Sequence, residues 1–303
     1  MSAPVSYYNQ ISNMMFGFGD SHIPNPDTVS LVENITLNQM RLIVEEAIKV
    51  QTICSDPEAP PEDKKTLSGE ELVFLMRKDK YKMRRFLKYL YSQMQKHVHS
   101  NFAQPVPVQA PPKHNKLIEF IEYIDETGEL TDLSEYDEVK YERMVRADRM
   151  SLALGEEAYM KFYKARCSSF MQKSMSQIRN FERLKQWIDP GNTVNFTNDA
   201  LNVLSYYAYE TVALIIDYAL LVRLDHNRKA DPLENLQGTH YSADMFKGEQ
   251  FNGPNPDYSR VYSGQAPISV NEIKEVMRRL YMPQAGICLL GKKMPSSRTI
   301  IVV

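Results

Sequence analysis

Apolar residues recur along the chain at steps of three and four, and this spacing divides it into helices of very unequal length. Residues 28–54 contain neither Gly nor Pro, which predicts one uninterrupted helix roughly 40 Å long. A shorter amphipathic segment precedes it at residues 8–18, and the capping-box pair Ser68 and Glu71 predicts a short helix after it. The apolar stripe of the long helix includes Val29, Val32, Ile43, Ala47 and Val50.

The same order of short, long and short helices is predicted again in the second half of the chain. One helix is expected to end at Asp189, where Pro190 and Gly191 follow, and Thr197 is expected to cap a long helix that runs to about residue 224. Ser269 and Glu272 repeat the capping-box spacing and open another short helix. The apolar stripe of the second long helix is Leu201, Leu204, Ala208, Val212, Ile215, Ala219 and Val222.

A long helix flanked by two short ones leaves much of its apolar stripe uncovered. Burial of apolar surface contributes roughly 25 cal/mol per Å², so two such units are expected to pair. We therefore predict an all-α fold in which two histone folds pair within one chain as a handshake, with extra linker helices. The predicted handshake core is Val32, Ile43, Ala47, Leu204, Ala208, Val212 and Ile215.

The segments around these two units give a predicted domain organisation. The expected parts are a first histone fold with a C-terminal extension helix (1–99), a proline-rich and acidic linker with a short helix (100–137), connecting helices and a second histone fold (138–282), and a tail (283–303). The second fold carries an insertion at 226–266, which is too long for an ordinary connection in a compact domain and is expected to be mobile or ordered by a partner.

Composition and charge exclude several classes of protein. The 303 residues carry a formal net charge of −2, which argues against binding polyanions through overall charge. The most apolar stretch, residues 206–224, contains Glu210 and Asp217, so we expect no membrane span. Neither the six His and three Cys nor any Ser/His/Asp grouping has a catalytic or metal-binding spacing, so we expect a non-enzymatic protein with no metal and no cofactor.

Two acidic residues stand out on the second long helix. Glu210 and Asp217 are seven residues apart and share the face opposite the pairing stripe with Tyr206. One interpretation is a contact surface for a basic partner protein. The other is that further helices of this chain cover this face and bond to the acids, because unpaired buried carboxylates are costly. The pattern leaves these two alternatives open.

A basic run and an acidic run form a second pair of candidates. The basic run, from Arg77 to Lys88, offers Arg77, Lys78, Arg84 and Arg85 as a contact face for nucleic acid or an acidic protein. Because the apolar residues of this helix occupy one face, the charges are better explained as its solvated side. The acidic run, Glu135, Asp137 and Glu138, is expected to be a solvated linker.

Several segments resemble the suppressor-of-Ty-three family, the histone-fold subunit of the SAGA transcriptional coactivator. They are Met14–Asp20, Leu31–Glu33, Glu71–Lys80, Arg84–Tyr89, Thr127–Leu130, Glu138–Met144 and Tyr207–Val212. The resemblance implies two histone folds paired within one polypeptide, a nuclear location and a role without catalysis in presenting the TATA-box-binding protein to promoters. It also implies other histone-fold subunits of a SAGA-type complex as partners.

Histone folds often pair an arginine before the third helix with an aspartate in its first turn. The corresponding positions of this chain are Lys65 and Glu71, and lysine lacks the bidentate fork of arginine, so a weaker brace is expected. The matching place in the second fold is Ala266, which cannot form one.

The hypothesis that follows is a nuclear adaptor whose outer face binds the TATA-box-binding protein, with Glu210 first, Asp217 second and Tyr206 beside them as contacts. The alternative is a DNA-binding histone-fold pair that uses the basic helix from Arg77 to Lys88; we expect no sequence-specific nucleic acid recognition.

Overall fold

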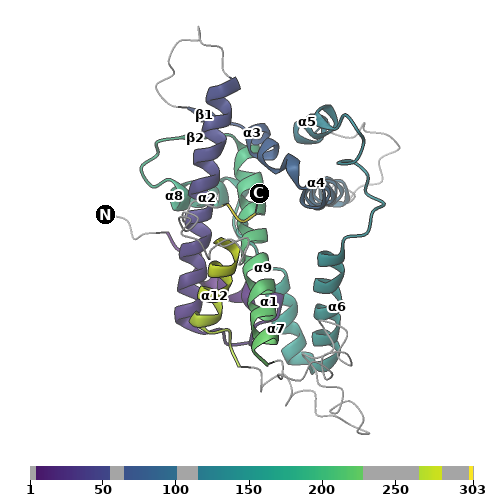
Figure 1. Ribbon diagram of the computed structural model, residues 1–303, viewed down its shortest axis with the longest axis vertical. Coiled ribbons are helices and arrows are strands. Elements are labelled where there is room, and N and C mark those ends of the chain that lie inside the picture. Colours follow the sequence, from purple (N-terminus) through teal and green to yellow (C-terminus); the bar gives the residue numbers. More distant parts are fainter. Residues whose placement is uncertain (1–4, 55–64, 101–114, 228–265, 282–299, 303) are drawn as a thin grey trace, which may run out of the picture.

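The computed structural model describes residues 5–54, 65–100, 115–227, 266–281 and 300–302, and this part of the chain is built mainly of helices (Figure 1). The predicted all-α class is confirmed. Of the described helices, none combines the length and the apolar composition that a membrane span requires.

The first half contains the predicted series of short, long and short helices. They are α1 (Tyr8–Phe18), α2 (Pro26–Cys54) and α3 (Gly69–Leu75). Helix α1 ends at Gly19, whose φ of 120° is a conformation that residues with a side chain rarely adopt. Helix α3 begins with a complete capping box, because the backbone N–H of Ser68 donates to Glu71 Oε2 at 3.0 Å and the Ser68 hydroxyl accepts from the first turn.

The second half repeats the series. Its helices are α8 (Gln177–Ile188), α9 (Asn198–Asn227) and α12 (Val270–Tyr281). The backbone N–H of Ala200 donates to the Thr197 hydroxyl at 3.2 Å, so Thr197 caps α9 as predicted. At α12, the backbone N–H of Ser269 donates to Glu272 Oε2 at 2.6 Å and the backbone N–H of Glu272 donates to Ser269 Oγ at 3.3 Å.

The two halves contact each other through their long helices. Helices α2 and α9 lie side by side, α9 also contacts α1 and α3 of the first half, and α2 contacts α8 and α12 of the second (Figure 1). One continuous hydrophobic core contains residues from both halves. The seven residues predicted for the handshake core, each fully buried, all belong to it: Val32, Ile43, Ala47, Leu204, Ala208, Val212 and Ile215.

Loops from the two halves also meet at both ends of this helix pair. At one end, strands β1 (Thr66–Leu67) and β2 (Asn195–Phe196) run parallel, with Thr66 opposite Asn195. At the other end, the backbone N–H of Ile268 donates to Asp20 Oδ1 at 2.8 Å, and its carbonyl accepts from the Thr28 hydroxyl at 2.8 Å. The loop before each long helix is therefore joined to the loop before the last short helix of the other half.

The connecting helices lie along one side of the α2–α9 pair (Figure 1). They are the one-turn η1 (Met76–Lys78), α4 (Lys80–Ser100), α5 (Lys116–Ile124), α6 (Glu138–Ala153) and α7 (Glu156–Arg166). Helix α5 contacts α3, and α7 contacts α1. A second small apolar cluster, Phe16, Ala147, Met150, Phe162 and Ala165, packs α6 and α7 against α1.

Parts of the predicted linker, insertion and tail lie outside the described residues. These parts are 101–114, 228–265, 282–299 and 303. The described end of the tail is buried at Ile301 and Val302, and the backbone N–H of Ile301 donates to Gln39 Oε1 of α2 at 2.8 Å.

The predicted ion pair between Lys65 and Glu71 at the start of α3 is wrong. Glu71 caps its own helix, and Lys65 Nζ donates instead to the Thr52 hydroxyl at 2.6 Å. In the second half a brace does form, from a residue that the pattern did not indicate: Arg223 of α9 binds Glu272 of α12 at 2.7 and 3.0 Å and also donates to the carbonyl of Ala266 at 2.8 Å. An arginine from the long helix replaces the missing basic residue at position 266.

Candidate functional site

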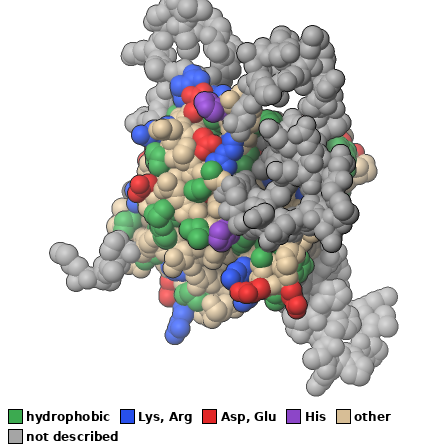
Figure 2. Space-filling view, turned by 90° about the horizontal axis from the view of Figure 1, so that it is seen from below, with side chains coloured by type: hydrophobic (Ala, Val, Ile, Leu, Met, Phe, Trp, Pro, Cys, Tyr) green, Lys and Arg blue, Asp and Glu red, His purple; other side chains and the backbone are tan. Residues whose placement is uncertain are grey.

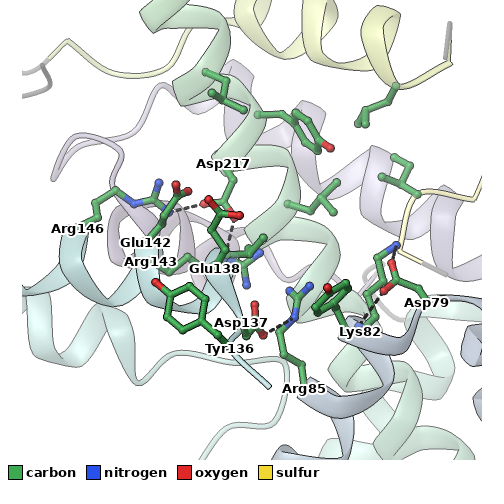
Figure 3. A pocket seen from close by; sticks show the side chains of 17 residues that line it. Asp79, Lys82, Arg85, Tyr136, Asp137, Glu138, Glu142, Arg143, Arg146 and Asp217 are labelled. Atoms are coloured by element: carbon green, nitrogen blue, oxygen red, sulfur yellow. Dashed lines mark hydrogen bonds and ion pairs between the residues drawn. The ribbon is translucent and has the colours of Figure 1, made fainter. Parts of the chain in front are cut away.

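The outer face of α9 carries Glu210 and Asp217 two turns apart, facing α6. The carboxylates are mostly covered, with relative side-chain exposures of 15% and 17%. Two arginines of α6 cover them. Arg143 Nε binds Asp217 Oδ2 at 2.6 Å, and Arg146 pairs with Asp217 Oδ1 (Figure 3). Arg143 Nη1 also binds Glu210 Oε2 at 3.1 Å. Arg143 thus bridges both acids.

Helix α4 joins the same group of charges. Arg85 Nε lies 3.0 Å from Asp137 Oδ2, and Arg85 Nη1 lies 3.4 Å from Glu210 Oε2. Asp137 also fixes where α6 begins, because its Oδ1 accepts from the backbone N–H of Lys140 at 3.1 Å. We call these six residues the ion-pair network. Its members are Arg85, Asp137, Arg143, Arg146, Glu210 and Asp217.

The network is electrically balanced, with three arginines facing three carboxylates. Burial by itself would lower the pKa of Arg143, but the charges of Glu210 and Asp217 outweigh it and hold that pKa above its usual value. Removal of one member leaves its partners partly buried without a counter-ion, and an uncompensated buried charge strongly lowers the stability of the fold. The network therefore fastens α4 and α6 to α9.

This geometry supports the second interpretation of Glu210 and Asp217, in which further helices of this chain cover the acidic face and bond to it. Other helices of the chain cover the face, and Glu210 is bonded to Arg85 and Arg143 rather than offered to a partner. Tyr206 is 8% exposed and packs against the rings of Phe86 and Tyr89, with ring centroids 5.0 and 4.9 Å away, so its expected role as a surface contact is corrected. Asp217 still lines an open cleft.

The four residues predicted as a basic contact face do not form one exposed basic surface. Arg84 is buried, donates to the carbonyl of Glu129 at 2.8 Å and pairs with Glu135, while Arg85 belongs to the network. The expectation that Glu135 and Asp137 form a solvated linker is therefore wrong, because these acids bind the two arginines. Each acid lies about fifty residues from its arginine in the sequence, so the pattern of charges along one helix does not indicate the pairing.

Arg77 and Lys78 are the members of the predicted basic contact face that remain exposed. The guanidinium of Arg77 lies 3.8 Å from the centroid of the Phe74 ring and donates to the carbonyl of Phe74 at 2.9 Å. On the face shown in Figure 2, the described acidic and basic side chains are interspersed rather than gathered by sign. These features weaken the DNA-binding alternative.

A cleft of about 860 Å³ opens beside the network (Figure 3). One wall is apolar and combines α9, α12 and the C-terminal end through Leu214, Leu221, Leu280 and Ile301. The other wall is polar and comes from the start of α4, residues 136–137 and the first half of α6. Three tyrosines also line the cleft: Tyr81, Tyr136 and Tyr218.

Sequence reasoning missed the arginines that complete this site. Arg143 and Arg146 are three residues apart, so they lie on one face of α6, and this spacing was the available signal. No local pattern links them to Glu210, 67 residues away from Arg143. Within the described residues, no group of three or more His, Cys, Asp or Glu side chains is placed to hold a metal ion.

Comparison with known proteins places this architecture in a family. Residues 5–103 match the family described as "Transcription initiation factor IID, 18kD subunit". The chain is 31% identical over 282 residues to SAGA complex subunit Spt3 of Drosophila melanogaster, covering 91% of this chain and 68% of that protein. It is 24% identical to SAGA complex subunit Spt3 of Schizosaccharomyces pombe (91% of this chain, 90% of that protein) and 22% identical to Protein SPT3 of Kluyveromyces lactis (100% of each). The resemblance noted in the sequence is confirmed, and the chain belongs to the family of SAGA complex subunit Spt3.

Proposed function

We propose that this chain is a non-enzymatic, nuclear subunit of a SAGA-type transcription coactivator, that it assembles with other histone-fold subunits, and that it binds the TATA-box-binding protein. Its similarity to Spt3 proteins along 91% of its length supports the coactivator role.

The observation that carries the adaptor role is the shared core of the two halves. Helices α2 and α9 bury their apolar stripes on each other, so the surface that a lone histone fold would offer to a histone-fold partner is used inside the chain. Partners are then left with the outer surfaces, which include the connecting helices and the cleft beside α6.

In this proposal the acidic residues of α9 mainly position α6 rather than contact a partner directly. Glu210 is a positioning residue that holds Arg143 and Arg85, and through them it sets where α6 lies. Asp217 holds Arg143 and Arg146 and forms part of the cleft floor. A DNA-binding partner carries lysines and arginines, and the acidic side of this cleft is where such a partner finds opposite charge.

The test is direct binding of the purified full chain to the purified TATA-box-binding protein, followed by biolayer interferometry. We expect saturable one-to-one binding that weakens as salt rises, because opposite charges contribute to it. Lysozyme, also a basic protein, serves as the control and should not be retained. The proposal fails if the TATA-box-binding protein shows no more retention than lysozyme.

A further inference from the structure

Most charges that line the cleft are already neutralised by one another. Lys82 lies 3.4 Å from Asp79, Arg85 pairs with Asp137, and the arginines of α6 pair with Asp217. Two lining carboxylates are left over, Glu138 and Glu142, and neither has an ion-pair partner within the part of the chain that the structure describes. Among the described residues that line this cleft, the uncompensated charge is therefore negative.

The two glutamates stand one turn apart on the same side of α6 (Figure 3). Like charges at this spacing repel each other. Partial burial raises the pKa of Glu142, the charges of Glu138 and Asp217 raise it further, and Arg146, which is already bound to Asp217, offsets only part of this. A cation placed between the two carboxylates relieves this repulsion.

The opposite wall is suited to aliphatic side chains. Leu214 and Leu221 of α9 line the cleft together with Leu280 and Ile301, and Tyr218, which is 39% exposed, lines it as well. Tyrosine faces attract lysine and arginine. At about 860 Å³ the cleft is large enough for several side chains of an extended segment.

We propose that this cleft is a docking groove for a basic segment of the TATA-box-binding protein, with a lysine or arginine between Glu138 and Glu142 and aliphatic neighbours against Leu214 and Leu221. The inference rests on the function proposed above and adds the surface and the chemistry of recognition. Charge complementarity favours this occupant, because the cleft offers an apolar wall and two carboxylates that form no ion pair with any residue the structure describes.

The first experiment compares the full chain with the double variant Glu138→Gln/Glu142→Gln, using the purified TATA-box-binding protein as the probe. We expect affinity to fall about 5- to 20-fold, as is typical of two partly desolvated charge contacts, and to depend less on salt. The control is Glu156→Gln/Glu157→Gln, which removes two exposed charges from α7 outside the cleft and should bind like the parent chain. Thermal unfolding verifies that both variants fold.

Equal affinity of the parent chain and the cleft double variant contradicts the docking groove while leaving the proposed function in place. Absence of binding by the parent chain contradicts both.

A second experiment identifies the occupant, with photoreactive p-benzoylphenylalanine in place of Tyr218. Crosslinks to a lysine- or arginine-bearing peptide of the TATA-box-binding protein support the proposal. Crosslinks confined to residues 282–299 of this chain, or to a second copy, contradict it.

Discussion

Tyr7 and Tyr207 are both fully buried, but they differ in whether the hydroxyl has a hydrogen-bond partner. Tyr207 donates to the carbonyl of Leu72 at 2.7 Å, whereas the hydroxyl of Tyr7 has no hydrogen-bond partner among the described residues. An unpaired buried hydroxyl lowers stability, while a paired one contributes about 1 kcal/mol. We therefore expect Tyr207→Phe to lower the free energy of unfolding by about 1 kcal/mol and Tyr7→Phe to leave it unchanged or raise it. Urea denaturation of both variants measures this, and the reverse order contradicts the assignment.

Asp20, which joins the loop before α2 to the loop before α12, should make stability depend on pH. Its side chain is fully buried, Oδ1 accepts from the backbone N–H groups of Ser21 and Ile268, and burial raises its pKa despite these bonds. A raised pKa in the folded state means that protonation favours folding, so this contribution is lost as pH rises through the folded pKa. Relative to Asp20→Asn, the parent chain should therefore gain stability as the pH is lowered from neutral towards the usual carboxyl pKa of about 3.9. A difference that stays constant or has the opposite sign contradicts this.

At the scale of elements, the ion-pair network holds α6 in place. Arg143→Met leaves Glu210 and Asp217 without their shared counter-ion, so we expect a loss of about 2–3 kcal/mol of stability and faster hydrogen exchange in α6. The control is Lys161→Met on α7, whose pair with Glu157 at 3.0 Å is exposed and should cost less than about 0.5 kcal/mol. Equal losses in the two variants contradict the fastening role.

The helices themselves could be predicted, because their signals are local. The capping boxes Ser68–Glu71 and Ser269–Glu272 fix helix starts from a span of four residues, and the glycine at position 19 ends α1. The network could not be predicted in this way. Arg143 and Glu210 meet only because the chain returns on itself, and a solvated helix face and an ion-paired one have the same sequence pattern.

At the scale of the whole molecule, pairing of arginines with the chain's own acids predicts weak interaction with DNA. Arg84 and Arg85 are occupied by Glu135, Asp137 and Glu210, so few exposed cations remain along η1 and the start of α4. We expect no retention of duplex DNA by the chain alone in an electrophoretic mobility assay, even at low salt. Retention that falls steeply with salt would favour the DNA-binding alternative.

The two halves of this chain bury their long helices in a single core. Ile43 of α2 and Val212 of α9 are both fully buried in it. Ile43→Ala should cost about 2–4 kcal/mol, a typical penalty for such a cavity. Hydrogen exchange followed by mass spectrometry provides the test. If the two long helices share one core, this substitution accelerates exchange in α2 and α9 together. Acceleration confined to the first half, with α9 unchanged, would contradict it.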